Sequence, residues 1–250
     1  MPIAANLLKK WGRICGKKSE DSWYGLARYW GTLRDNKSHY SYSYLPMIKY
    51  MQSLQFLEVS KPVSALRLGV IVGHEKIAPG ATFAAPWGKV AEYEYNSEVA
   101  DLMHKYAEKL GVDLMIFTRD NVGISGGYRK AQAAKCDVAI ELHCNAFNRQ
   151  VQGSEVLCSS EQSDKALAAH IQAGLIRLFK REGNANRGVK IRNSGRGAEN
   201  CTSYPGKANC LVEPAFCDNT QDAQMLMDMK IEYAQMLVDQ MVRYWSAASK

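Results

Sequence analysis

The sequence lacks most of the patterns that assign a chain to a class at first sight. Its apolar runs are all shorter than the ~20 residues that a membrane-spanning helix needs, and it has no P-loop, nucleic-acid-binding motif or internal repeat. Its seven cysteines include no C-x-x-C pair, and an odd, unpaired set is more typical of a reducing cytosol than of a disulfide framework. The first residues also lack the basic-then-apolar order of a secretory peptide. We therefore expect synthesis in the cytoplasm without a signal peptide, and no nucleic-acid partner.

Residues 1–62 differ in composition from the rest of the chain. They carry ten Lys/Arg against four Asp/Glu, which is six of the seven net positive charges, and three of the five tryptophans. One interpretation is a small helical extension packed on the main domain. The other is a basic, aromatic arm that binds an anionic cell wall or membrane surface. Because proline disfavours helix in the residue before it, Lys61-Pro62 is a plausible boundary, with the main domain at 65–247.

From residue 65 onward, strand-like and helix-like segments alternate. Apolar runs predict strands at 68–72, 114–117, 138–142, 155–157 and 210–212, and helical periodicity predicts helices at 95–110, 128–134, 167–178 and 223–244. Ser163 or Asp164 is the expected N-cap of the third helix. The alternation predicts an α/β fold: a single mixed, mostly parallel sheet with helices on both faces, plus the small helical N-terminal extension.

The stretch 182–207 is rich in Gly, Asn, Ser and Arg and shows no periodicity. A connection of this length is usually functional or disordered. Its basic residues either grip substrate carboxylates or belong to a solvated loop, and the sequence leaves both interpretations open. These residues are Arg187, Lys190, Arg192 and Arg196.

Three predicted strands end in residues that bind metals or move protons. His74, His143 and Glu213 each follow a short apolar run. In open α/β sheets ligands bind outside the carboxyl ends of the strands, so these side chains are expected at one edge. A zinc hydrolase needs three N/O ligands and an open position, and Glu92 or Glu94 is a candidate for the third ligand. Glu213 is the candidate for the carboxylate that moves protons.

Three other motifs are weaker. His74-Glu75 opens like H-E-x-x-H, but Ala78 occupies the second histidine position. The segment 123–127 fits the G-x-S-x-G nucleophile elbow, but residues intervene between the strand and the motif, so a loop leading into a helix explains it equally well. Cys144 beside His143 is a candidate nucleophile or ligand, although a buried cysteine is the usual outcome.

Five ordered motifs together resemble the zinc-dependent N-acetylmuramoyl-L-alanine amidases, a family that includes phage endolysins and bacterial cell-wall enzymes. The resemblance runs from about residue 66 to 244. The matching motifs are Gly73-His74 with Gly80-Ala81, Glu92 with Asn96, Thr118-Arg119, Arg129 with Asp137 and His143-Cys144-Asn145-Ala146, and Glu213 with Ala215, Phe216 and Asn219.

The resemblance implies that His74, Glu92 and His143 bind Zn²⁺ and that Glu213 is the catalytic carboxylate, with Glu94 as the fallback for Glu92. The chain departs from the family pattern at four positions, none of them a ligand. Glu75 and Lys76 replace two glycines, Glu141 replaces a serine, and Ala133 replaces an asparagine. The two extra carboxylates are expected to alter the charge around the metal.

The expected function is zinc-dependent hydrolysis of the amide between N-acetylmuramic acid and L-alanine in peptidoglycan. The chain is expected to act on the cell wall as a phage or prophage endolysin, although a bacterial enzyme exported by another route also fits. Two alternatives stay open at this point. One is another zinc hydrolase, such as a carboxypeptidase or amino-acid deacylase, and the other is a non-catalytic wall-binding protein.

Overall fold

The computed structural model describes residues 66–204 and 208–248. The predictions for residues 1–62, including the boundary at Lys61-Pro62, lie outside the described residues. Within the described part, no helix combines the length and the apolar character needed to cross a membrane.

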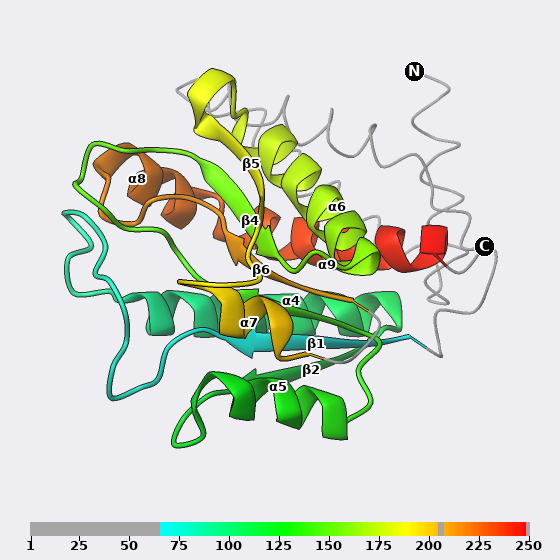
Figure 1. The fold of residues 1–250 in the computed structure, drawn as a ribbon. Coiled ribbons are helices and arrows are strands. Elements are labelled where there is room, and N and C mark those ends of the chain that lie inside the picture. The colour runs from blue at the N-terminus through cyan, green and yellow to red at the C-terminus, as the bar shows by residue number, and fades with distance from the viewer. Residues whose placement is uncertain (1–65, 205–207, 249–250) are drawn as a thin grey trace, which may run out of the picture. The chain divides into compact units, whose positions relative to one another are not determined.

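A six-stranded sheet forms the centre of the described chain (Figure 1). Its strands are β1 (Arg67–Val72), β2 (Asp113–Thr118), β3 (Val138–Leu142), β4 (Ser154–Cys158), β5 (Asn186–Ile191) and β6 (Ala208–Glu213). Their order is β2-β1-β3-β6-β4-β5, and every neighbouring pair is parallel except β4 and β6. The prediction of a single mixed, mostly parallel sheet is confirmed.

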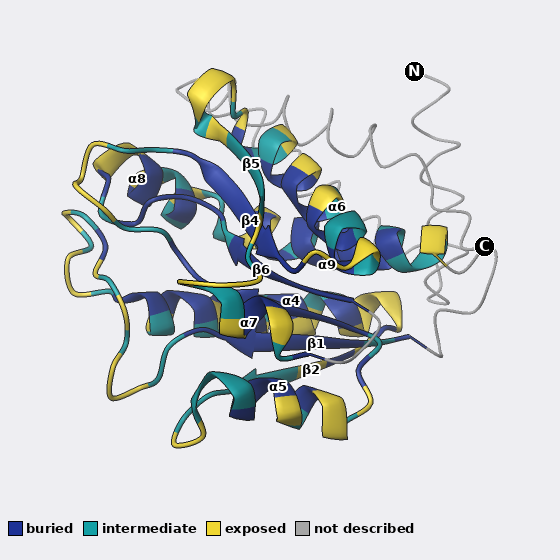
Figure 2. Cartoon of the chain, viewed as in Figure 1, coloured by how far each residue is buried: buried dark blue, intermediate teal, exposed yellow. Residues whose placement is uncertain are grey.

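Helices cover both faces of this sheet, as predicted. On one face, α4 (Glu92–Leu110) and α6 (Gln162–Phe179) lie on the strands, and α9 (Lys230–Ala248) packs against both helices. On the other face lie α5 (Gly123–Ala133) and the short α7 (Ala198–Thr202). Figure 2 shows that the helices turn buried residues toward the sheet and exposed residues outward.

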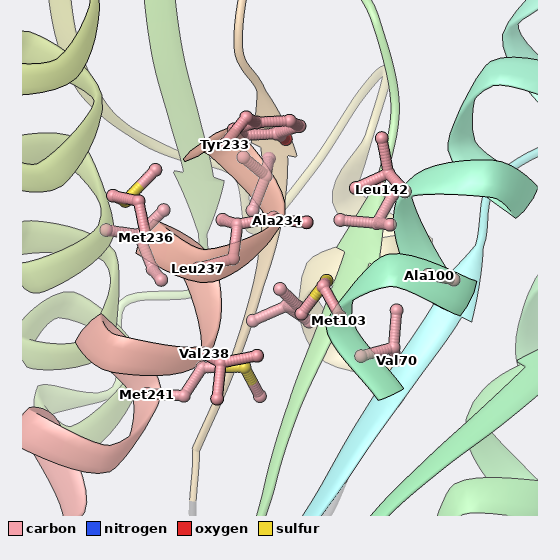
Figure 3. Packing of buried hydrophobic residues seen from close by; sticks show 14 of the residues in the cluster. Val70, Ala100, Met103, Leu142, Tyr233, Ala234, Met236, Leu237, Val238 and Met241 are labelled. Carbon is pink, nitrogen blue, oxygen red and sulfur yellow. The ribbon is translucent and has the colours of Figure 1, made fainter. Parts of the chain in front are cut away.

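The main core lies between the sheet, α4 and α9 (Figure 3). Val70 and Leu142 from the strands, Met103 from α4, and Leu237 and Val238 from α9 are all fully buried there. Burying a side chain of this size stabilises a fold by about 1.5–3 kcal/mol relative to leaving it exposed. This packing fixes the position of α4, whose first turn carries part of the functional site.

Two helix predictions are wrong in detail. Helix α4 begins at Glu92 rather than at residue 95, and it ends at Leu110 as predicted. Helix α6 begins at Gln162, so the expected cap residues Ser163 and Asp164 lie in its first turn.

Three further segments differ from their predictions. The stretch 182–207 is not a bare loop, because it contains the 3-10 turn Gly183–Ala185, strand β5 and helix α7. Helix α5 begins at Gly123 rather than at Tyr128. The last predicted helix is two, α8 (Thr220–Asp228) and α9, which are separated at Met229.

The parallel strands deliver their carboxyl ends to one edge of the sheet. In register, Val72 of β1 pairs with Leu142 of β3, which pairs with Val212 of β6. The residues that follow these positions therefore lie side by side. Because β4 is antiparallel to β6, it starts at this same edge, and Glu155 pairs with Glu213.

Candidate metal centre

His74 stands just beyond the end of β1, in a backbone conformation that is unusual for a residue with a side chain. Its φ is 66°, in the left-handed region. The glycines of the Gly-His and Gly-Ala motifs leave room for imidazole rings. A Cβ on Gly80 would lie 2.7 Å from the His74 ring, and a Cβ on Gly73 would lie 2.5 Å from Nε2 of His143. Both glycines therefore border the candidate site.

Glu92 is the first residue of α4, and backbone amides hold its carboxylate. Oε1 accepts a hydrogen bond from the Ala81 N–H at 3.0 Å, and Oε2 accepts one from the Cys144 N–H at 3.0 Å. Burial raises the pKa of Glu92, but hydrogen bonds with His143 and His74 and the charges of both rings outweigh burial and lower it to about 2. Glu92 is therefore a buried carboxylate that stays ionised.

Two imidazole nitrogens converge on this carboxylate. His74 Nε2 lies 3.2 Å and His143 Nδ1 lies 3.5 Å from Oε2 of Glu92. The backbone N–H of His143 donates to the Val212 carbonyl at 3.0 Å, which extends the β3–β6 pairing by one residue. The three side chains come from the ends of β1 and β3 and from the start of α4.

This donor set fits a zinc ion. His74, Glu92 and His143 each offer one ligand atom, and these atoms all lie within 4.8 Å of one another. Two ligand atoms at zinc-bonding distance from a tetrahedral ion are roughly 3.4 Å apart. The two nitrogen–oxygen distances given above are close to that value. Three N/O ligands leave a fourth position open, as in catalytic zinc sites.

Glu213, the last residue of β6, lies next to His143 along the edge of the sheet. Its Oε2 is buried and has no hydrogen-bond partner among the described residues. Burial raises the pKa of Glu213 to about 8, against the lowering effect of the His143 charge, and the nearby Glu92 and Glu155 charges raise it further. A carboxyl group whose pKa lies near neutrality can both accept and return a proton.

Comparison with known proteins now bears on this geometry. A family model described as N-acetylmuramoyl-L-alanine amidase matches residues 69–241, which is well over half of the chain. The chain belongs to the N-acetylmuramoyl-L-alanine amidase family. It is therefore an enzyme of the class that hydrolyses an amide bond in peptidoglycan. A comparison with curated protein sequences returns no match.

Solved amidase structures share this fold. The catalytic domain of CwlV from Bacillus (Paenibacillus) polymyxa is 17% identical, with a TM-score of 0.62 over 72% of this chain and 98% of that one. AmiC2 of Nostoc punctiforme is also 17% identical, with a TM-score of 0.61 over 72% of this chain and 97% of that one. The catalytic domain of the CD27L endolysin targeting Clostridia difficile is 26% identical, with a TM-score of 0.56 over 71% of this chain and 97% of that one.

The match to the amidase family favours the amidase function over the other functions that the sequence left open. The structure also shows where the alternative candidate residues lie. Glu94 accepts a hydrogen bond from the Ala91 N–H at the start of α4, so Glu92 and not Glu94 faces the histidines. Ser125 lies in the first turn of α5 and donates to Glu199, and Cys144 is buried with its thiol pKa raised well above the usual value by burial. Neither has the setting of an activated nucleophile.

The loop after His143 carries the amidase-family Asn-Ala motif and is held in place from several sides. The Phe147 and Arg149 N–H groups both donate to Oδ2 of Asp218 at 3.0 Å, and the Asn145 N–H donates to the Ala215 carbonyl at 2.9 Å. Ala215 and Asp218 follow Glu213 in sequence. These hydrogen bonds therefore connect the segment after β3 to the segment after β6.

The basic residues of the 182–207 stretch have separate surroundings. Arg187 Nε donates to Glu155 at 2.9 Å, and its guanidinium lies over the Phe216 ring, so it is tied to the sheet edge. Arg196 is exposed, and its charge lowers the pKa of Glu213. Arg196 is therefore the member of the set whose charge reaches the candidate catalytic carboxylate.

Sequence reasoning missed the role of Glu141, which it treated only as a departure from the amidase pattern. Glu141 is fully buried, and its Oε1 lies 2.7 Å from Nη1 of Arg119 and 3.2 Å from Nε2 of His143. Burial raises the pKa of Glu141, but the hydrogen bond and charge of His143, followed by the charge of Arg119, lower it to about 2. The signal was present in β3, where a carboxylate interrupts an otherwise apolar strand that is buried along its whole length.

Proposed function

We propose that this amidase uses a zinc ion to hydrolyse the amide between the lactyl group of N-acetylmuramic acid and the L-alanine of the stem peptide. The observation that carries the proposal is the convergence of His74 Nε2 and His143 Nδ1 on Glu92, at distances that suit a shared ion. The match to the amidase family supports the choice of substrate.

In this proposal His74, Glu92 and His143 hold the ion, and Glu213 is the catalytic carboxylate. Bound zinc supplies a Lewis acid for the scissile carbonyl and lowers the pKa of water in its open position. Glu213 takes the proton of the attacking water and returns it to the departing amine of L-alanine. Burial raises the pKa of Glu213, which favours its holding the proton between the two transfers.

We further propose that the chain works as a phage or prophage endolysin that acts on the cell wall. The similarity to the CD27L endolysin catalytic domain supports this choice, while the similarity to bacterial amidases keeps a host enzyme as the alternative. Residues 65–247 would form the catalytic unit. Residues 1–62, with most of the net positive charge, would serve as an accessory arm toward an anionic wall or membrane surface.

The direct test is mass spectrometry of purified peptidoglycan digested by the protein, with and without a zinc chelator. We expect free stem peptides that begin with L-alanine, lost on chelation and restored by added zinc. Cleavage at another bond, or release of the same peptides after complete metal removal, would contradict the proposal. Cleavage of small acyl-amino acids with no action on walls would favour a deacylase instead.

Single variants separate the two roles. Glu213→Gln keeps the side-chain volume and should retain one zinc per chain while kcat falls by about 10²–10⁴-fold, because the proton shuttle is lost. His74→Ala should lose zinc. The matched control is His104→Ala, since that histidine lies on the exposed side of α4, near Leu114 and Glu108. It should keep both properties, and a fully active Glu213→Gln enzyme would overturn the catalytic assignment.

A further inference from the structure

Four hydrogen-bond donors converge on the buried carboxylate of Glu141. Arg119 Nη1 and His143 Nε2 face Oε1 at 2.7 and 3.2 Å. The Tyr128 hydroxyl and the Asn200 amide donate to Oε2, each at 2.7 Å. The donors come from β2's end, α5, α7 and the His143 loop, so the carboxylate joins the helices of one face to the candidate metal centre.

When His143 is neutral, as a metal ligand must be, this arrangement fixes which of its nitrogens carries the proton. An ionised carboxylate only accepts hydrogen bonds, so Nε2 of His143 must donate to it as N–H. In the neutral ring the lone pair then belongs to Nδ1. Nδ1 is the nitrogen that lies 3.5 Å from Glu92 Oε2, on the side of His74. The tautomer that Glu141 selects is therefore the one that presents a metal-binding atom to the site.

The Glu141 side chain itself has no freedom to turn away. A carboxylate offers about four lone-pair positions, and four donors occupy them. Arg119 pairs with Glu141 at 2.7 Å and offsets part of its charge beside the cluster of His74, Glu92 and His143.

We propose that Glu141 is a positioning residue that locks His143 as an Nδ1 ligand of the metal. The proposal rests on the proposed zinc-dependent function and deepens it. Histidine ligands commonly donate their second ring N–H to a carboxylate, and loss of such a partner typically costs 10–100-fold in metal affinity. Glu141 is one of the positions at which the sequence departs from the expected family pattern, so the proposal concerns this chain's own residues.

The first test measures zinc affinity by competition with a chelator over a pH series and compares the limits at high pH, where proton competition for His143 no longer contributes. Glu141→Gln replaces one oxygen by an NH₂ group that faces donors, so it should weaken zinc binding by about 10–100-fold. Tyr128→Phe keeps the Arg119–Glu141 pair and removes one donor, so it should fold and weaken binding by a smaller factor.

The matched control is Asp164→Asn. Asp164 is also a buried carboxylate, and it accepts from the Ser159 hydroxyl and the Asn209 N–H near the start of β6, at the opposite edge of the sheet. This variant should lower the thermal midpoint and leave zinc affinity unchanged. If Glu141→Gln behaves in the same way, Glu141 is a structural residue only and the proposal fails.

A second readout needs no variant. Nitrogen NMR of the histidine rings in the zinc-loaded wild-type protein should show His143 metallated at Nδ1 and protonated at Nε2, with slow exchange of that proton. Metallation through Nε2 would overturn the proposal even if Glu141→Gln failed to fold. A wild-type protein that binds no zinc would overturn the proposed function as well, whereas zinc binding unaffected by Glu141→Gln would overturn only the role of Glu141.

Discussion

His74 shows how single residues shape this centre. A non-glycine residue in the left-handed region costs on the order of 1 kcal/mol or more and persists only where its surroundings hold it. Here the bare Cα of Gly80 lies against the ring, and Gly80 itself has a φ of 84°. The local backbone therefore accepts strain at His74, beside a glycine whose positive φ is unstrained, in order to present one imidazole to Glu92.

Gly80→Ala is expected to damage the metal centre and not only the fold. Its new Cβ would lie 2.7 Å from the His74 ring, so the ring must shift away from Glu92 and zinc affinity should fall by tenfold or more. The matched control is Gly111→Ala, which has a similar φ of 69° and open space around the added Cβ. Both variants should lose about 1 kcal/mol of stability from backbone strain.

The comparison is made by urea unfolding and by chelator competition on the same samples. Equal stability losses with a zinc defect in Gly80→Ala alone would support the role of the glycine in seating His74. Equal zinc affinity in the two variants would mean that the ring moves without consequence for the metal.

Zinc binding should release protons. In the metal-free protein, burial lowers the pKa of His143, but hydrogen bonds to Glu141 and Glu92 outweigh burial and raise it to about 10. The ring is then protonated near pH 7.5, and a ligand must be neutral, so binding expels about one proton from His143. Glu213, with a pKa of about 8, adds a fraction of a second proton. Apparent affinity should therefore rise with pH and level off above about pH 10.

Calorimetry in two buffers of different ionisation enthalpy measures this release. Glu213→Gln should remove the fractional contribution and leave about one proton, which makes it an internal control. Zinc binding with no proton release near pH 7.5 would show that His143 is already neutral in the metal-free protein.

The residues that converge at the candidate metal centre could be predicted from sequence, but the reasons for their placement could not. Position at strand ends marked His74 and His143, while the choice between Glu92 and Glu94 depended on where α4 begins. Ala91 offers no side-chain cap at that start, and the signal that marks it is Glu94, whose carboxylate accepts from the Ala91 N–H. The partners of Glu141 come from positions 22 and 59 residues away, and only the fold brings them together.

At the scale of elements, buried segments were predictable and edge segments were not. Strands β1 and β3 are buried along nearly their whole length and read as apolar runs. Strand β5 lies at the sheet edge with no fully buried residue, so its sequence resembles a loop. The break between α8 and α9 falls at Met229, where neither glycine nor proline marks it.

At the scale of the whole molecule, the antiparallel pairing of β4 has a simple cause in the connections. The segment between β3 and β4 contains no helix, and a parallel return would need a long crossover, usually helical. The chain therefore turns back at the site edge and places Glu155 beside Glu213. The sequence indicated that no helix lies between β3 and β4. The insertion of β6 between these two strands could not be predicted, because it depends on pairing across distant segments.

The uneven charge of the chain leads to a prediction about residues 1–62. Their removal takes away six of the seven net positive charges, while the family match begins at residue 69. If they form a binding arm, the shortened chain should hydrolyse soluble muropeptides at the full-length rate. It should also sediment less with purified walls, and its binding should lose most of its salt dependence, because screening acts on exposed charge.

A full-length variant with Lys9, Lys10, Lys17 and Lys18 changed to glutamine separates charge from length. If residues 1–62 form a binding arm, it should lose wall association in part and keep its thermal midpoint. Cosedimentation over a salt series and thermal unfolding are measured for all three proteins. If the shortened chain unfolds or loses hydrolysis of soluble muropeptides, residues 1–62 are a structural part of the catalytic unit, and the binding-arm interpretation is wrong.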